Sequence, residues 1–170
     1  AKNVIQYEID ALKKIKSYIG NSFNQIVKTI LNCRHGKIII SGVGKSGIIG
    51  KKWAATFSSI GIPSFFLDAS NASHGDMGQI TSNDVVILIS LSGQSEELKN
   101  IIQYISRNKN VKLIGITSKK KSILYKNSDI KFLMPNVKEA DQANIVPTSS
   151  TTVQLALGDA IAITCMRYNN

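Results

Sequence analysis

The fold is decided by a strand-like run that leads straight into a glycine-rich turn, Ile38-Ile39-Ile40-Ser41-Gly42-Val43-Gly44-Lys45-Ser46-Gly47. The stretch from Ile48 to Ile60 that follows is helical in character. At such a turn the first N–H groups of the helix are free, and the helix dipole favours a negative charge. Lys45 and Ser46 add an ammonium group and a hydroxyl group to these donors. We therefore expect the turn to meet a phosphate group.

Strands and helices alternate along the rest of the chain. We expect strands at 37–41, 64–67, 84–90, 111–116 and 130–133, with helices at 48–59, 96–107, 122–127 and 148–168 and a loop or short helix at 68–80. This alternation predicts an α/β fold, a three-layer αβα sandwich around a five-stranded parallel sheet in the flavodoxin-like order 2-1-3-4-5. In the last helix we expect the core-facing residues to be Val153, Leu155, Ala156, Ala160 and Ile163.

The chain reads as one domain. Apolar residues recur at helical spacing between Val4 and Leu31, and Gly20-Asn21-Ser22 divides that stretch into two helices. Neither a linker nor an internal repeat is evident over the 170 residues. We therefore predict a single domain, 1–170, with an N-terminal helical segment (1–35) and an αβα core (36–170).

The composition narrows the range of partners. The net charge is +10, but the lysines are scattered, and the one local run, Lys119-Lys120-Lys121, has no aromatic residues among it. We interpret that run as a solvated loop rather than a nucleic-acid surface, although the positive balance would steer a phosphorylated substrate. Apolar runs are too short to span a membrane, and no signal peptide is evident. Cys33 and Cys165 lack metal or disulfide spacing, so we expect a cytoplasmic protein without a metal.

The loops at the carboxyl ends of parallel strands build the site in such folds. Three of these loops are rich in hydroxyl groups or glycine, and His74 lies in a fourth. The candidates for binding are Gly44, Ser46, His74, Ser90, Ser92, Gln94, Ser95, Thr148, Ser149, Ser150 and Thr151, and those for catalysis are Lys45, Glu97 and Glu139. Each has a plainer explanation as well, because Ser and Thr cap helices and Glu97 suits the dipole of a first helical turn.

A dehydrogenase is a competing interpretation. Gly42, Gly44 and Gly47 match the dinucleotide-binding pattern Gly-x-Gly-x-x-Gly, and Asp68 ends the second strand, where a ribose-binding acid would lie. A pyrophosphate turn does not need Lys45, however, and the other loops carry hydroxyl groups instead of apolar nicotinamide contacts. The Walker A pattern fails because Ile39 stands where its first glycine should be.

Several segments together resemble the sugar isomerase (SIS) domain, and their order is most similar to the arabinose-5-phosphate isomerases of lipopolysaccharide (Kdo) biosynthesis. The segments are 42–47 with 54–59, 72–78 (ASHGDMG), 89–97 (ISLSGQSEE) and 146–152 (VPTSSTT). The resemblance runs over nearly the whole chain. It implies interconversion of D-ribulose 5-phosphate and D-arabinose 5-phosphate, with the family's lysine at Lys45 and its two glutamates at Glu97 and Glu139. It also places His74 and the serine and threonine turns at the sugar phosphate.

This chemistry suits the residue types. An aldose–ketose isomerisation moves a proton between C1 and C2 through an enediol, which requires a base poised near neutrality and a group that stabilises charge on oxygen. We expect burial to raise the pKa of a partly buried glutamate for this purpose. Glu97 is the favoured base, Glu139 is a second acid/base or orienting group, and Lys45 neutralises the phosphate or the enediolate. No cofactor is required.

The chain departs from the family at two places. Relatives continue with a His-Pro-Gly-Gly segment and often a pair of CBS domains, whereas this chain stops at Asn170. Asp68 replaces a histidine that is associated with zinc in some members, so the resemblance implies no metal site in this chain. By resemblance we expect a homo-oligomer, a dimer or a tetramer. A non-catalytic domain that senses a sugar phosphate is the alternative function.

Overall fold

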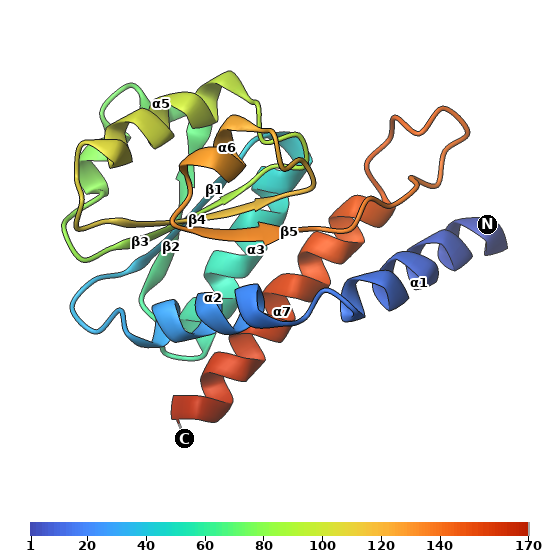
Figure 1. Ribbon diagram of the computed structural model, residues 1–170, viewed down its shortest axis with the longest axis horizontal. Coiled ribbons are helices and arrows are strands. Elements are labelled where there is room, and N and C mark those ends of the chain that lie inside the picture. The colour runs from blue at the N-terminus through green and yellow to red at the C-terminus, as the bar shows by residue number, and fades with distance from the viewer. Residues whose placement is uncertain (170) are drawn as a thin grey trace.

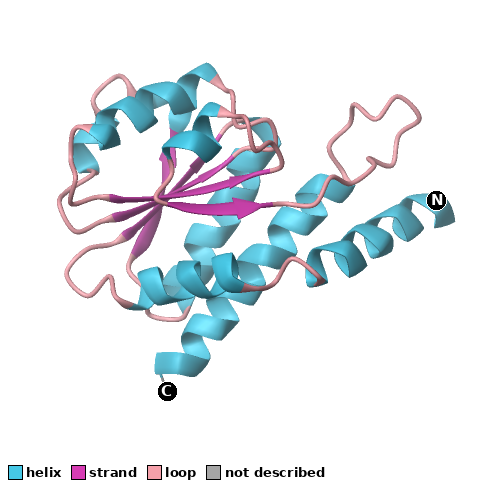
Figure 2. Cartoon of the chain, viewed as in Figure 1, coloured by secondary structure: helices cyan, strands magenta, loops and turns pink. Residues whose placement is uncertain are grey.

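The computed structural model describes residues 1–169 and contains one parallel sheet (Figures 1 and 2). Its strands are β1 (Ile38–Gly42), β2 (Ser64–Asp68), β3 (Val85–Ile89), β4 (Lys112–Thr117) and β5 (Ile130–Leu133). They follow the order β2-β1-β3-β4-β5, with every neighbouring pair parallel. The predicted fold and strand order are confirmed. Each strand begins and ends within one residue of the predicted position.

Helices cover both faces of the sheet (Figure 1). One face carries α2 (Asn21–Leu31), α3 (Gly44–Ser59) and α7 (Ser149–Asn169), and α1 (Lys2–Lys16) packs on α7; the other carries α4 (Ala69–Ala72), α5 (Glu96–Ser106) and α6 (Ile123–Asn127). A short 3-10 helix, η1 (Asp76–Gln79), follows α4. Alternate residues of β1 serve the two layers, because Ile38 and Ile40 join one buried cluster and Ile39 the other.

The chain segments that follow β1 and β3 leave the sheet in opposite directions at the carboxyl ends of these two strands. Gly42, the last residue of β1, lies opposite Ile89, the last residue of β3. The chain leaves β1 for α3 on one face and leaves β3 for α5 on the other face. Ligands of open α/β sheets bind at such a switch point, and the glycine turn (42–47) and the serine loop (90–95) both begin here.

The predicted inner face of α7 is mostly wrong. Val153 is buried as expected and the partly buried Ala160 packs against the core, but Leu155 and Ala156 are only half-buried and Ile163 is 40% exposed. The other residues of α7 that are buried in the core are Leu157, Ile161, Ala162 and Cys165. The indole of Trp53 lies against Gly158, and its Nε1 donates a hydrogen bond to the carbonyl oxygen of Gln154 at 3.0 Å. A glycine gives no signal in a hydrophobic pattern, so this contact was missed.

The N-terminal helices belong to the same core as the sheet. Ala11 and Ile15 of α1, with Phe23 and Ile26 of α2, join the buried cluster that contains Ile38 and Ile40. Figure 1 shows α1 running outward from this contact, past the N-terminal end of α7. Among the residues described, no helix combines the length and the apolar character that a membrane span requires.

Candidate functional site

The glycine turn presents the start of α3 without a side-chain cap. The N-cap residue is Val43, and Gly44 adopts the left-handed conformation with φ of 58°. A Cβ at Gly47 would come within 2.6 Å of the Gly42 carbonyl oxygen, so the helix can begin this close to the strand only with glycine there. Lys45 is exposed and forms no ion pair with any residue in the range 1–169. The turn therefore offers free N–H groups and a free ammonium group.

A small cavity of about 100 Å³ adjoins this turn. Gly44 lines it, but Lys45 does not; the cation that lines it is Lys51, whose ammonium lies 5.3 Å from the centroid of the Phe66 ring. Asp68 also lines it and accepts a hydrogen bond from the Ser70 N–H at 2.9 Å. The sequence reasoning missed Lys51, although its position about two helical turns after Gly44 could have indicated it.

The serine loop, residues 90–95, is folded by its own hydroxyl groups. Ser90 Oγ accepts from the Gly93 N–H at 3.0 Å, and Ser92 Oγ accepts from the Gln94 N–H at 3.3 Å. Ser95 is the N-cap of α5 but makes no side-chain capping bond, so ordinary capping does not account for it. The first turn of α5 thus keeps free N–H groups beside the half-buried Glu97.

Glu139 is bound to the start of α7. Its Oε2 accepts from the Thr148 N–H (2.8 Å), the Thr148 hydroxyl (3.1 Å) and the Ser150 N–H (3.2 Å), and the residue is only 5% exposed. Burial alone would raise the pKa of this carboxyl, but hydrogen bonds from Ser150 and Thr148 outweigh burial and hold the pKa below its ordinary value. The expectation of a raised pKa is therefore wrong for Glu139.

The loop between Glu139 and Thr148 projects from the molecule (Figure 1) and is closed at its base. The Ala140 N–H donates to Thr148 Oγ1 at 2.9 Å, and the Glu139 N–H donates to Asn144 Oδ1 at 2.7 Å. Ser149 and Ser150 are buried at the start of α7, and the Ser149 hydroxyl has no partner within the described chain. Thr151 Oγ1 donates to the Thr148 carbonyl oxygen at 2.7 Å. Residues 148–151 therefore form the start of α7 and the hydrogen bonds that hold it in place.

His74 lies on an exposed turn that follows α4. The preceding Ser73 Oγ accepts a hydrogen bond from Asn100 Nδ2 at 3.0 Å, which ties this segment to α5, the helix that carries Glu97. The predicted residues thus form three groups around one end of the sheet: the glycine turn, the serine loop with the His74 segment, and the start of α7. Within residues 1–169, no side-chain hydrogen bond joins one of these groups to another.

The sequence pattern of the SIS domain matches residues 30–164. The chain belongs to the SIS domain family. It is 45% identical to "Arabinose 5-phosphate isomerase KdsD" of Francisella tularensis subsp. tularensis, over all of this chain and 52% of that protein. It is 40% identical to the KdsD protein of Escherichia coli K12, over 98% of this chain and 50% of that protein. The chain therefore spans about half the length of these curated relatives.

Solved structures agree with this assignment to the SIS domain. A protein from Escherichia coli CFT073, solved in complex with arabinose 5-phosphate, superposes with a TM-score of 0.94 and 37% identity, covering 99% of this chain and 88% of that one. A sugar-phosphate isomerase-like protein from Listeria monocytogenes gives a TM-score of 0.93 and 34% identity, covering 98% and 87%. The resemblance inferred from the sequence motifs is confirmed.

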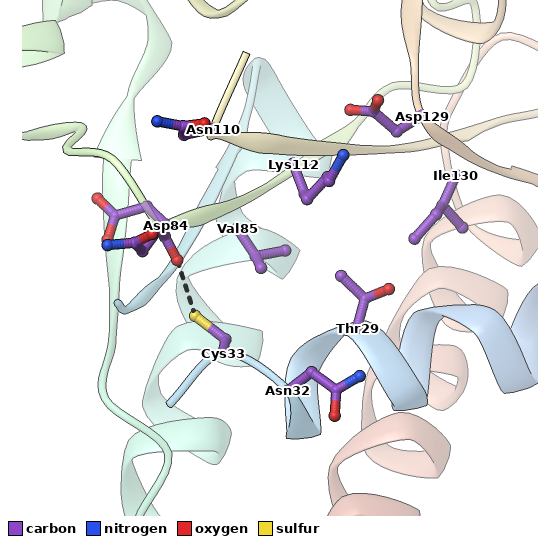
Figure 3. A pocket seen from close by; sticks show the side chains of 10 residues that line it. Thr29, Asn32, Cys33, Asp84, Val85, Asn110, Lys112, Asp129 and Ile130 are labelled. Atoms are coloured by element: carbon purple, nitrogen blue, oxygen red, sulfur yellow. Dashed lines mark hydrogen bonds between the residues drawn. The ribbon is translucent and has the colours of Figure 1, made fainter. Parts of the chain in front are cut away.

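The SIS domain has a second cavity at the opposite end of the sheet, where the strands begin (Figure 3). It measures about 350 Å³ and lies at the amino ends of β3, β4 and β5, where Cys33, Asp84, Lys112 and Asp129 line it. Asp84 pairs with Lys37 at 2.8 Å, and although burial opposes ionisation, hydrogen bonds from Lys37 and Thr81 hold its pKa below the ordinary value. This cavity contains none of the predicted site residues. Among the described residues, no group of three His, Cys, Asp or Glu side chains is arranged to hold a metal ion.

Proposed function

We propose that this SIS domain carries the active site of an aldose–ketose isomerase that interconverts D-ribulose 5-phosphate and D-arabinose 5-phosphate. The observation that carries the proposal is the pair of uncapped helix starts, α3 and α5, on one end of the sheet, with Lys45 in the first and Glu97 in the second. Uncapped N–H groups and an ammonium suit a phosphate, and a half-buried carboxylate suits proton transfer. The similarity to KdsD proteins and to a protein solved with arabinose 5-phosphate supports this substrate class.

In the proposed reaction the Glu97 carboxylate removes the proton from C1 of the ketose. Negative charge then develops on the C2 oxygen, and Lys45 or the nearby N–H groups stabilise it. The C1 hydroxyl proton moves to that oxygen to give the isomeric enediolate, and the proton held by Glu97 is delivered to C2 as the aldehyde forms at C1. The substrate contacts fall to Gly44, Ser46, His74, the serine loop and the start of α7. This proton transfer requires neither a metal nor an organic cofactor.

Glu139 has a different part in this proposal. A carboxylate that already accepts several hydrogen bonds, and whose pKa is lowered, holds a proton poorly near neutral pH. We therefore assign it the orienting role: it fixes the start of α7 beside the substrate. Glu97 remains the proton-transferring group.

We further propose that the enzyme acts as a homodimer or homotetramer in the cytoplasm. The cavity at the glycine turn, about 100 Å³, is smaller than the roughly 300–1,000 Å³ of typical ligand pockets, which favours a site that a second copy completes. Exposed apolar residues on α1 and at the loop tip, including Ile5 at 58% and Ile145 at 74%, offer the surface for it. Both cysteines are free thiols, which suits a reducing compartment.

The direct test is to incubate the complete protein with D-ribulose 5-phosphate in deuterated water and follow the sugar by NMR. We expect D-arabinose 5-phosphate to appear, with deuterium at the carbon that receives the proton. Glu97→Gln and Lys45→Ala should each lower turnover by about 10²–10⁴-fold, the usual contribution of a general base or a charge-stabilising group. Lys109→Ala, at an exposed lysine far from this end of the sheet, is the matched control.

Two results would contradict the proposal. Wild-type-like turnover in Glu97→Gln or in Lys45→Ala would show that the substituted residue does not have the catalytic role proposed for it. Thermal stabilisation by the sugar phosphates without any conversion would instead support a sensing domain.

A further inference from the structure

The Lys119-Lys120-Lys121 run lies in the turn that joins β4 to α6, at the carboxyl end of the sheet. This is the end that carries the serine loop. All three lysines are exposed, and none forms an ion pair within the described part of the chain. The sequence suggested an ordinary solvated loop, but the fold brings the run beside the proposed substrate site.

Hydrogen bonds join this turn to the serine loop on both sides of the lysines. Before the run, the Leu91 carbonyl oxygen accepts from the Ser118 N–H (3.1 Å), the Ser118 hydroxyl (2.9 Å) and the Thr117 hydroxyl (3.1 Å). After it, the Gly93 carbonyl oxygen accepts from the Leu124 N–H at 3.1 Å. The position of the lysine run is therefore set relative to the serine loop.

The two segments also pack without space between them. Gly93 has φ of 63°, and a Cβ there would lie 2.5 Å from Ser122 Oγ and 2.8 Å from Thr117 Oγ1. Only glycine permits this approach. The lysine run and the serine loop thus form one compact unit.

The charges around this unit leave the lysines uncompensated. Glu96 pairs with Lys99. Glu97 is then the one remaining acid of the serine loop and the first turn of α5. Three adjacent cations attract a dianion strongly compared with a neutral sugar, and their field reaches over a Debye length of about 10 Å at 0.1 M salt.

We propose that the Lys119-Lys120-Lys121 run is a specificity-determining element that draws in and retains the phosphate end of the substrate. The inference rests on the proposed function, because it assumes that a phosphorylated ligand enters at the serine loop. The lysines act through the electrostatic field at the entrance of the site. They therefore raise the rate and affinity of substrate binding and leave the chemical step unchanged.

The test compares two triple variants with the same change in net charge. One is Lys119→Gln, Lys120→Gln, Lys121→Gln. The control is Lys28→Gln, Lys109→Gln, Lys112→Gln, which removes three exposed lysines from α2 and from the amino-end side of β4. KM and kcat for D-ribulose 5-phosphate are measured at about 0.01 M and about 1 M salt, where the Debye length is roughly 30 Å and 3 Å.

We expect the first variant to raise KM about three- to tenfold at low salt, at the lower end of known steering effects, with kcat unchanged and no difference at high salt. The control should differ little from the wild type under both conditions. Equal KM shifts in the two variants, or a shift that persists in high salt, would overturn the inference.

Binding of inorganic phosphate, followed by thermal shift, gives the same comparison without turnover. Weaker phosphate stabilisation in the first variant alone, at low salt alone, supports the inference even if no isomerase activity is found. Phosphate stabilisation equal to that of the wild type overturns it, whatever reaction the protein catalyses. Absence of turnover in the wild type contradicts only the proposed function.

Discussion

The carboxylate of Glu139 does at the start of α7 what a capping serine does at other helices, and it adds a negative charge where the helix dipole favours one. Because its pKa is lower in the folded protein than in the unfolded chain, ionised Glu139 stabilises the fold. That contribution is complete above the ordinary glutamate pKa and is lost as the pH falls through the lowered, folded-state pKa.

We expect Glu139→Gln to lower the free energy of unfolding by about 1–2 kcal/mol at neutral pH, the range for a lost cap and its charge. The gap between variant and wild type should narrow as the pH falls below the ordinary glutamate pKa. Urea denaturation at a series of pH values measures this. Glu96→Gln, at an exposed acid of α5 paired with Lys99, is the control and should change stability by less than about 0.5 kcal/mol. A gap that stays constant with pH would contradict the assignment.

At this scale the sequence predicted where the candidate residues lie in the fold better than which contacts each one makes. The positions of Lys45, Glu97 and the serine loop at the carboxyl ends follow from motif order and parallel topology alone. The hydrogen bonds from Thr148 to the Glu139 carboxylate could not be predicted, because they depend on the path of the loop from 140 to 147. That Lys51 lies on the same side of α3 as Gly44 could have been read from helical spacing, but its contact with the Phe66 ring could not.

Among the elements, α7 shows how one close contact can decide the orientation of a helix. Trp53 is fully buried, and a Cβ at Gly158 would overlap its indole ring. Apolar side chains lie all around α7, with Leu155 and Ile163 on one side and Leu157 and Ile161 on the other. The sequence therefore predicted that the helix exists but not which side faces the core. The central strand β3 was predictable because burial on both faces leaves only one pattern, the continuous apolar run from Val85 to Ile89.

We expect Gly158→Ala to destabilise the protein although alanine favours helices by about 1 kcal/mol over glycine. The added methyl must displace either the Trp53 ring or the helix backbone, and overpacking of this kind costs about 1–3 kcal/mol or more. The midpoint of thermal unfolding should fall by at least about 2–4 °C for each net kcal/mol. Gly78→Ala, where no atom lies within 4 Å of the new Cβ, is the control. A midpoint equal to or above that of the wild type would show that α7 can shift on α3 freely.

The whole molecule is asymmetric in its apolar surface. α1 uses Ala11 and Ile15 to pack into the core, while Ile5, Ile9 and Leu12, at spacings of four and three residues, form a stripe that remains exposed. The helix extends beyond the sheet toward the side where the loop from 140 to 147 projects (Figure 1). The fold class and strand order could be predicted from the alternation of strands and helices, but this outward course of α1 could not. Periodicity marks an apolar stripe without saying what covers it.

If a second copy covers that stripe, a charge placed within it should separate the copies. We expect the wild type to elute as a dimer or tetramer in size-exclusion chromatography with light scattering, and the double variant Ile5→Glu, Ile9→Glu to elute as a monomer. The reason is that each buried isoleucine contributes about 1.5–3 kcal/mol to such an interface, whereas a buried unpaired carboxylate opposes association. Gln6→Glu with Lys13→Glu adds acids to exposed positions of the same helix and should leave the assembly intact. Isomerase activity, measured in parallel, should fall with the loss of assembly, because the site on one copy is open. A wild type that is monomeric, or a double variant that assembles as before, would rule out α1 as the contact.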